Sequence, residues 1–430
     1  MLLIKSLAPV QSSDIVSSAA RKIEQDGVVS FLTAAADRIS YNSSVLLFKT
    51  LFGSITRDEM IQRAKQSDQY WKYGSSEKIE VQNQENEDVP DLFEDYSGTY
   101  EVSQPFVCEL NGGRLINATD PFVLTRDRKV VMEAEKPIFG PRKDATQADT
   151  PFHKRTEYSE RTAGSRMWQL CRGYALSQSG LQKSTHFERV FPLIEGGDFG
   201  YYHWLLEKLP TVRGLKHYEE VTGREPTVVV ESNPPEWVQE TLSLVGIDNF
   251  VTLDVPFITT NRLIISSCRE TVPRNQSVYE PSEGDIRWLN HEMKSRAPPS
   301  SMDHPDRIYI SRENLDVRYV TNRKELEGVL EEFDIEICTP ETLSVAEQIR
   351  LYENADLIVG PHGGALANTI FSKEASIIEF HTKPYPSYQH LSQLCGHEYQ
   401  FLQCEGGSDH HTPFEVDVPE LRNLLASSVH

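Results

Sequence analysis

From residue 189 to residue 380 the chain alternates short apolar runs with segments of helical periodicity, and this alternation constrains its fold most strongly. The runs that we predict to be strands are RVFPLI, PTVVVES, NRLIISS, RIYISR, DIEICT, DLIVG and SIIEF. The predicted helices are YYHWLLEKLPTVRGL, PEWVQETLSLVG, NRKELEGVLEEF and SVAEQIRLYENA, the last with a capping box of Ser344 and Glu347. Strands that alternate with helices predict an α/β fold with parallel sheets and right-handed crossovers.

The alternation is interrupted once, by the segment SRAPPSSMDHPD, whose adjacent prolines are typical of a linker. Two runs of alternation favour two Rossmann-like domains that face a cleft, and ligands then bind at the carboxyl ends of the strands. We place the N-terminal Rossmann-like domain at residues 105–282 and the C-terminal one at residues 283–430.

The first part of the chain is patterned differently. Residues 1–68 are predicted to form a helical extension, with Phe31, Leu32, Ala35 and Ile39 on one helical face. This face either packs on the body of the protein or lies at a membrane surface. Residues 69–104, with the acidic stretch EKIEVQNQENEDVPDLFED, predict a mobile linker or a surface loop. The alternating segments PFVCEL, GRLIN and RKVVMEAE then predict a small β-rich region that ends near residue 140.

The charge balance limits the partners. The 64 acidic and 43 basic residues give a formal net charge of -21, which argues against nucleic acid as the main partner because phosphate binding needs basic patches. The N-terminus lacks the apolar region of a signal peptide, and no apolar run approaches the roughly 20 residues of a membrane span. We therefore expect a cytoplasmic protein, with the alternative of peripheral association at the inner membrane face.

The scattered cysteines predict reduced thiols: Cys108, Cys171, Cys268, Cys338, Cys395 and Cys404.

The stretch LIVGPHGGALAN ends a predicted strand in a glycine-rich loop around His362. Gly363 and Gly364 allow a ligand to approach the backbone, and the helix predicted to follow would offer free N–H groups to an anion. His362 could donate to a phosphate or act as an acid or base. The alternative is a tight turn in which glycine is needed only for steric reasons.

The stretch RIYISRENLDVRYVTN places Arg312 at the end of a strand and Arg318 six residues later. Two guanidinium groups at a sheet edge are fixed, permanently charged donors that suit a diphosphate. The alternative is that these arginines pair with Glu313 or Asp316 at the surface. Because the arginines and the glycine loop fall at the same predicted edge, together they favour a diphosphate pocket.

The stretch GGDFGYYHWLLEKLP places His203 and Glu207 four residues apart on one helical face. A carboxylate at this spacing can orient an imidazole, which would serve as a general base or hold a substrate hydroxyl. Zinc is disfavoured because the HExxH pattern and a third nearby ligand are missing. The alternative is a core histidine packed between Tyr202 and Trp204.

Several motifs are absent from the sequence. There is no P-loop, no GxGxxG dinucleotide motif and no GxSxG nucleophile elbow. No Asp-x-Asp pair ends a strand, so a Mg²⁺- or Mn²⁺-bound sugar nucleotide is not indicated.

Taken together and in order, YYHWLLEKLP, RIYISRENLDVRYVTN and LSVAEQIRLYENADLIVGPHGGALANTIFSKEASIIEFH resemble glycosyltransferase family 61, from Gly196 to His381. The segment PFVCELNGGRLIN resembles the family's preceding β region more loosely. The resemblance implies an inverting, metal-independent transferase of the GT-B type, with two Rossmann-like domains facing a cleft. It also implies a nucleotide-sugar co-substrate, here expected to be UDP-linked, and no cofactor.

By this resemblance the C-terminal domain would hold the nucleotide and the N-terminal domain the acceptor. The family often has Asp where Glu207 stands, so the base stays open between the His203–Glu207 pair and His362. Glu379, at a strand end, would accept from ribose hydroxyls or serve as an ordinary strand-end carboxylate. The expected site residues are His203, Glu207 and His362 for catalysis; Arg312, Arg318, Gly363, Gly364 and Ala365 for the diphosphate; Asn322, Asn368 and Glu379 for the nucleotide and ribose; and no metal ligand.

The acceptor expected from the resemblance is a glycan, a lipid-linked glycan or a protein, in surface polysaccharide or glycoconjugate synthesis. A rival hypothesis is a non-catalytic nucleotide-sugar or glycan-binding protein on the same scaffold, and a third is an epimerase that needs no acceptor. Binding without transfer, or a product formed without acceptor, would distinguish them. The sequence carries no signal for an oligomeric state.

Overall fold

The computed structural model describes residues 53–82, 97–117, 121–131, 184–194, 200–267, 271–272, 282–301, 303–383, 385–406 and 412–428. Most of the predicted helical extension, including the face around Phe31, lies outside these ranges. Within them, helix α2 (Arg57–Gln66) begins at Thr56, whose hydroxyl accepts a hydrogen bond from the Glu59 N–H. None of the helices in these ranges combines the length and apolar character that a membrane span needs.

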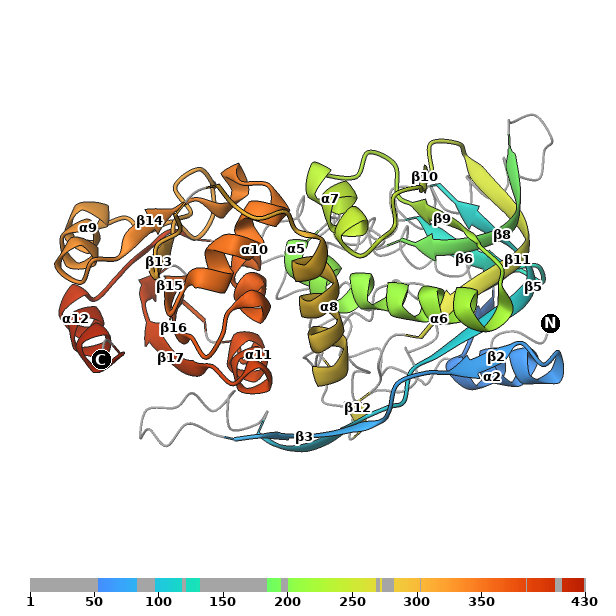
Figure 1. Cartoon of the computed structure of the whole chain (residues 1–430), viewed down its shortest axis with the longest axis horizontal. Coiled ribbons are helices and arrows are strands. Elements are labelled where there is room, and N and C mark those ends of the chain that lie inside the picture. Colours follow the sequence, from blue (N-terminus) through green and yellow to red (C-terminus); the bar gives the residue numbers. More distant parts are fainter. Residues whose placement is uncertain are drawn as a thin grey trace, which may run out of the picture.

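The fold is mixed α/β, with a large mixed sheet and a smaller parallel one (Figure 1). Nine strands form the large sheet, in the order β1-β7-β6-β5-β11-β8-β9-β10, with β2 paired to β5. Their bounds are β1 Gly53–Ile55, β2 Tyr70–Lys72, β5 Phe106–Ile116, β6 Phe122–Thr125, β7 Lys129–Val131, β8 Thr185–Leu193, β9 Thr227–Val230, β10 Val251–Thr252 and β11 Phe257–Ser266. The predicted β-rich region is confirmed, but it continues the same sheet, because β5 pairs antiparallel with β11.

The second sheet has five parallel strands in the order β14-β13-β15-β16-β17. Its strands are β13 Arg307–Ile310, β14 Glu336–Cys338, β15 Leu357–Pro361, β16 Ser376–His381 and β17 Glu398–Gln403. The helices of this half are α9 Arg323–Glu332, η5 Pro340–Thr342, α10 Val345–Asn354, η6 Gly364–Phe371, α11 Ser387–Cys395 and α12 Val418–Ser428. Every residue of β15 is buried, as expected for a strand inside a parallel sheet. The capping box of α10 is confirmed, with both of its hydrogen bonds present.

Helices between the two sheets pack into one apolar core. Helices α6 (Val212–Thr222), α7 (Glu236–Leu244) and α8 (Glu283–Arg296) share a buried cluster with α10 and η6, including Leu215, Leu242 and Leu366 (Figure 1). Polar contacts cross the same boundary, since the Glu240 carboxylate accepts from the Val345 N–H at 2.5 Å. The two halves are therefore in direct contact along these helices.

A long hairpin runs beneath both halves (Figure 1). Strands β3 (Glu77–Val81) and β4 (Gly98–Val102) form it, and β12 (Thr271–Val272) extends it. Ile79, Val81, Tyr100 and Val102 bury one face of the hairpin and pack against Leu394 of α11. The domain boundaries stay predictions, but the described part of residues 69–104 is not the loop or linker that we expected. The acidic composition concealed the alternation of Ile79 and Val81.

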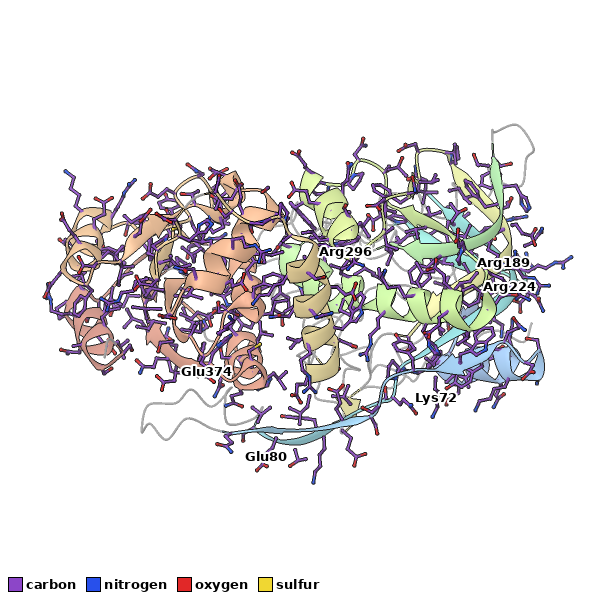
Figure 2. All side chains as sticks on the ribbon, in the orientation of Figure 1. Lys72, Glu80, Arg189, Arg224, Arg296 and Glu374 are labelled. Atoms are coloured by element: carbon purple, nitrogen blue, oxygen red, sulfur yellow. The ribbon has the colours of Figure 1, made fainter. Side chains whose placement is uncertain are left out.

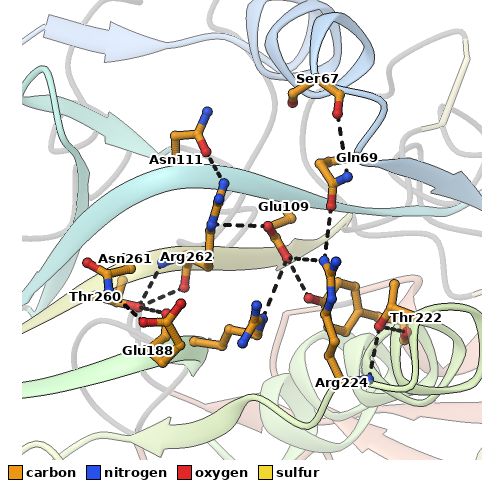
Figure 3. A network of polar contacts seen from close by, with 12 residues as sticks. Ser67, Gln69, Glu109, Asn111, Glu188, Thr222, Arg224, Thr260, Asn261 and Arg262 are labelled. Atoms are coloured by element: carbon orange, nitrogen blue, oxygen red, sulfur yellow. Dashed lines mark hydrogen bonds and ion pairs between the residues drawn. The ribbon is translucent and has the colours of Figure 1, made fainter.

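The buried carboxylate of Glu109 contacts polar side chains from several elements of the large sheet and from helix α6. Glu109 on β5 is 3 % exposed, and its Oε2 accepts from the Tyr218 hydroxyl at 2.5 Å. Arg224 Nη1 lies 3.4 Å from Oε2, Arg262 Nε lies 3.5 Å from Oε1 and Arg189 Nε lies 4.0 Å from Oε2 (Figure 3). Figure 2 shows Arg189 and Arg224 close together beside this sheet. Removing the carboxylate would leave three guanidinium groups without their shared counter-charge, so Glu109 is a structural ionic centre.

The described cysteines carry free thiols, as predicted: Cys108, Cys338, Cys395 and Cys404. Burial raises the pKa of the Cys338 thiol to about 11 and that of Cys395 to about 12. These thiols are therefore protonated and unreactive at neutral pH. Cys171 and Cys268 lie outside the described residues.

Candidate functional site

The carboxyl edge of the five-stranded sheet brings together residues that are far apart in the sequence. Strands β13 and β15 are parallel neighbours, and Arg312 and His362 each follow the end of one of them. Strand β16 lies beside β15 and places Glu379 opposite Gly360. The prediction that the arginine motif and the glycine loop meet at one sheet edge is confirmed.

The glycines of the loop make room for protein groups. A Cβ at Gly363 would lie 2.2 Å from Nη1 of Arg312, so a side chain there would collide with the guanidinium. The backbone at Gly363 is extended (φ 176°), so the demand is for space and not for a left-handed conformation. At Gly364 the nearest neighbour of a Cβ would be Tyr201 Cβ, 3.4 Å away. Gly363 thus seats Arg312 beside the loop, while Gly364 lies against Tyr201.

The two arginines share a desolvated environment. Burial, with a further contribution from Arg318, lowers the pKa of Arg312 to about 10, and burial also lowers the pKa of Arg318. Over the described residues, neither guanidinium forms an ion pair with a carboxylate, and Glu313 pairs with Arg323 instead. The surface pairing considered from the sequence is therefore not seen there. Two neighbouring cations that form no ion pair with a described carboxylate suit an anionic ligand.

Arg318 also carries a conformational cost. Its φ is 57°, in the left-handed region that a non-glycine residue rarely adopts. Its Nε is buried without a hydrogen-bond partner in the described part of the chain. Strain and an unsatisfied donor at one residue are typical of a binding site, where a ligand supplies the missing acceptor.

His362 is held by a buried carboxylate. Its Nδ1 lies 2.5 Å from Oε1 of Glu379, which is fully buried. Burial alone would raise the pKa of Glu379, but the charges of His381 and His362 and their hydrogen bonds lower it to about 2. Burial lowers the pKa of His362, an effect that Glu379 only partly offsets. At neutral pH the pair therefore consists of a carboxylate and a neutral imidazole.

The environment of Glu379 changes the role expected for it. Its Oε2 accepts from the Tyr399 hydroxyl at 2.6 Å and lies 3.3 Å from Nε2 of His381. Both oxygens thus have partners inside the protein, and the residue is fully buried. The prediction that Glu379 binds ribose is not supported by this geometry, which instead makes it a partner of His362.

Two predicted nucleotide residues also have internal roles. Asn322 donates to the Val416 carbonyl at 2.8 Å and accepts from the Val416 N–H at 3.0 Å. Asn368 is fully buried, accepts from the Tyr201 hydroxyl at 2.8 Å and donates to Gln348 at 2.8 Å. Asn368 therefore joins the glycine loop to the helix at Tyr201, and Asn322 fastens the start of α9.

The segment after the loop differs from the expected α-helix. Element η6 (Gly364–Phe371) is a 3₁₀-helix, and its residues from Leu366 to Phe371 are all buried. This buried segment contacts both α10 and α11. Ala365 lies in its first turn, half-buried.

His203 and Glu207 lie on an irregular helix. Helix α5 (Tyr201–His203) passes into the π-helix η3 (Trp204–Lys208), and π turns are frequent at functional sites. His203 Nδ1 lies 2.6 Å from Oε1 of Glu207, so the predicted contact between the two side chains is confirmed. The side chain of His203 is 37 % exposed, whereas that of Glu207 is 4 % exposed. The core position belongs to Trp204, whose Nε1 donates to Thr241.

Aromatic side chains connect the two histidines. The Tyr202 ring lies 5.3 Å from that of His203 and 5.5 Å from that of Tyr388, which in turn lies 5.4 Å from His362. The Tyr388 hydroxyl donates to the Gly363 carbonyl at 2.6 Å. The helix with His203 therefore meets the edge with His362 and Arg312.

Sequence reasoning missed His381, the last residue of β16, and the aromatic residues that follow it. His381 and Tyr385 stack on His362, with ring centroids 5.7 Å and 5.5 Å away, and Tyr388 and Tyr399 complete the surroundings. The aromatic run in HTKPYPSYQH, directly after a strand of the site, was the available signal. Among the described residues, His362, Glu379 and His381 also form the one group of three that could hold a metal ion, with ligand atoms within 4.8 Å of one another.

The mixed α/β fold places two arginines, which have no carboxylate partner within the described ranges, at a parallel sheet edge beside a histidine–carboxylate pair, and this combination suits an anionic ligand and proton transfer. Residues 201–378, which hold all of these groups except Glu379 and the aromatic residues that follow it, match the family model described as Glycosyltransferase 61. The match supports an assignment of this segment to glycosyltransferase family 61, and with it glycosyltransferase activity, which implies a donor and an acceptor substrate. A search of curated proteins found no match.

Proposed function

We propose that the protein is an inverting, metal-independent glycosyltransferase of the GT-B type. It would transfer a sugar from a UDP-linked donor to a glycan, lipid-linked or protein acceptor in surface polysaccharide or glycoconjugate synthesis. The observation that carries this proposal is the pair Arg312 and Arg318. Both are half-buried and have no ion pair with a carboxylate over the described residues, and Arg312 lies beside Gly363. The two sheets would belong to the two Rossmann-like domains.

The donor would bind at the edge of the five-stranded sheet. Arg312 and Arg318 would contact the diphosphate, and the exposed edge of His362 would lie beside it. As the glycosidic bond to phosphate breaks, negative charge grows on the departing diphosphate, and fixed cations stabilise that charge as a metal ion does in other transferases.

The acceptor would bind on the side of α5. His203 is the more exposed of the two histidines and has a carboxylate partner, so we assign it as the base that removes the proton of the acceptor hydroxyl. Glu207 would orient the imidazole and stabilise its cation. One displacement at the anomeric carbon then forms the bond to the acceptor oxygen while the bond to the diphosphate breaks, which inverts the configuration.

Donor identity is tested first by a thermal-shift screen of nucleotide sugars, since a true donor stabilises the fold by mass action. Turnover of that donor is then compared between wild type, Arg312→Ala and Arg318→Ala. We expect each variant to lose about 10²–10³-fold in rate, the usual cost of removing one donor to a developing anion. Arg323→Ala is the matched control, because Arg323 is exposed and pairs with Glu313 and Glu327.

Unchanged turnover in both variants would refute the donor site. Binding of a nucleotide sugar without transfer to any acceptor would favour the rival hypothesis of a non-catalytic binding protein. Cytoplasmic location and peripheral contact with the inner membrane face stay predictions from the sequence.

A further inference from the structure

Helix α5, which carries His203, has little local support at its start. Its N-cap position is Gly200, so no side-chain cap hydrogen bond holds the first turn. Only three residues are α-helical before the π-helix η3 begins. The position of this helix therefore depends on contacts with other elements. It lies where the two halves of the protein meet and contacts η6 (Figure 1).

One of these contacts joins Tyr201, two residues before His203, to the segment after the glycine loop. The Tyr201 hydroxyl donates to Oδ1 of Asn368 on η6 at 2.8 Å. The Tyr201 ring packs edge-on against Trp237 of α7, with ring centroids 5.3 Å apart. Its Cβ is the nearest atom that a side chain at Gly364 would meet. Tyr201 thus links the helix of the proposed base to the loop of the proposed donor site.

The hydrogen bonds of the fully buried Asn368 run in one direction. Its Nδ2 donates to Oε1 of Gln348 at 2.8 Å, and Nε2 of Gln348 donates to the Leu343 carbonyl at 3.1 Å. Because a backbone carbonyl can only accept, it fixes the orientation of the Gln348 amide, which in turn fixes that of Asn368. Oδ1 of Asn368 therefore faces Tyr201, whose hydroxyl has to donate. Burial raises the pKa of Tyr201, so the hydroxyl keeps its proton.

We propose that Tyr201 and Asn368 are positioning residues whose hydrogen bond holds the helix of His203 against the glycine loop of the donor site. Glu207 orients the imidazole ring, whereas the bond between Tyr201 and Asn368 fixes where that ring lies relative to a bound donor. A shift of about 1 Å in a reacting group can cost about 10²-fold in rate. This inference rests on the proposed function, because it takes His203 as the base.

The test is the release of UDP from UDP-N-acetylglucosamine, UDP-glucose and UDP-xylose, with water as the acceptor so that no acceptor has to be identified. The water oxygen bonds to the anomeric carbon, its proton passes to His203, and UDP leaves with the electrons of the broken bond. For Tyr201→Phe, which removes only the hydroxyl, we expect kcat to fall about 10–100-fold. Calorimetric titration with UDP should give an affinity within about 2-fold of wild type, because Arg312 and Arg318 are unchanged.

Tyr218→Phe is the matched control, since it also removes a buried tyrosine hydroxyl, the one that donates to Glu109 at 2.5 Å. It should lower the melting temperature and leave kcat unchanged, which a purely structural role of Tyr201 would also predict for Tyr201→Phe. A double-mutant cycle with Asn368→Leu then tests whether one bond carries the effect. The double variant should be no slower than the slower of the two single variants. Should Asn368→Leu not fold, Gln348→Met takes its place, because it removes the partner that orients the Asn368 amide.

Unchanged kcat in Tyr201→Phe, together with a slower His203→Ala, would overturn the inference and leave the proposed function standing. An equal loss of kcat in Tyr218→Phe, or a double variant slower than both single variants, would also overturn it. If wild type hydrolyses none of the three sugar nucleotides, or if His203→Ala is as fast as wild type, His203 is not the base. The inference then fails together with that part of the proposed function, whereas UDP binding still reports separately on the donor site.

Discussion

This protein contains two histidine–glutamate pairs with nearly the same contact distance. They differ in backbone setting, in the exposure of the histidine and in the neighbouring charges. Nδ1 of His203 lies 2.6 Å from Glu207, and Nδ1 of His362 lies 2.5 Å from Glu379. The first pair lies on a π-helix, with a histidine that is 37 % exposed. In the second pair, the histidine follows β15 and the glutamate lies on the neighbouring strand β16, and the histidine is 23 % exposed. The same local contact therefore occurs in two surroundings.

The surroundings assign different chemistry to each pair. Arg318 contributes to the lowered pKa of His362, and Glu379 has both oxygens occupied by internal partners. By contrast, the second oxygen of Glu207 is buried with no hydrogen-bond partner over the described residues. A histidine beside a cation suits an anionic ligand, whereas a partly exposed histidine that a carboxylate orients suits proton abstraction. Because both histidines contact a glutamate, that contact does not distinguish their roles. The charged groups around each pair are more informative about its chemistry.

The largest effect that we expect is on the rate, from His203→Ala. Loss of a general base costs about 10²–10⁴-fold in kcat, and the KM for the donor should change little because the arginines remain. Steady-state kinetics with a saturating acceptor measure this split. His186→Ala is the control, since His186 is an exposed histidine on β8 whose Nδ1 lies 2.9 Å from the Thr259 hydroxyl. A variant that keeps full kcat would move the role of base to His362 and reverse the comparison.

The second expected effect is on stability in acid, and it concerns only the pair at the sheet edge. The pKa of Glu379 is lowered to about 2, so its carboxylate stabilises the fold above the usual value near 4.5 and that contribution is lost as the pH falls toward 2. The lowered pKa of His362 acts in the same direction, because the unfolded chain binds its proton at a higher pH. We expect the contribution of Glu379 to be about 3 kcal/mol.

Urea unfolding between about pH 7 and pH 3 measures this loss. In Glu379→Gln the part of the slope below about pH 5 should become shallower, whereas Glu398→Gln should follow wild type. Parallel curves for wild type and Glu379→Gln would show that the buried carboxylate does not titrate as described.

A third, smaller effect is expected from Gly363→Ala. The added Cβ would lie 2.2 Å from Arg312 Nη1, and since this is the far end of a flexible side chain, the guanidinium can move while the fold persists. We expect the donor KM to rise about 10–100-fold, the cost of one or two charge-assisted hydrogen bonds, with little change in the melting temperature. The control is Gly328→Ala on α9, where a Cβ would meet nothing within 4 Å. Equal donor KM values in wild type and Gly363→Ala would indicate that Arg312 does not contribute to donor binding.

The sequence predicted what depends on local pattern and on sheet topology. Alternation located the strands and helices from β8 to β16, and parallel pairing predicted that Arg312 and His362 would meet at one edge. Side-chain partners that depend on packing could not be predicted. Tyr399 donates a hydrogen bond to Glu379, and Tyr201 donates one to Asn368. Both bonds join elements that are far apart in the sequence, so local pattern does not predict them. The glycine loop shows both cases. Its position was predictable, but the reason for Gly363, which is the guanidinium of Arg312 from the segment after β13, was not.

The smallest expected effect comes from metal removal. It tests whether the pair at the sheet edge, unlike the pair on the π-helix, is part of a metal site. The sheet-edge pair belongs to the group His362, Glu379 and His381, which could hold a metal ion, whereas the π-helix pair has no comparable third ligand among the described residues. In the structure these atoms bind one another, and the neighbouring Arg318 disfavours a cation. We therefore expect activity after dialysis against EDTA to equal that of untreated protein, with metal analysis confirming removal. A loss that Zn²⁺ or Mn²⁺ restores, and that His381→Ala abolishes, would make the sheet-edge pair a metal centre and transfer the stabilisation of the diphosphate from the arginines to the ion.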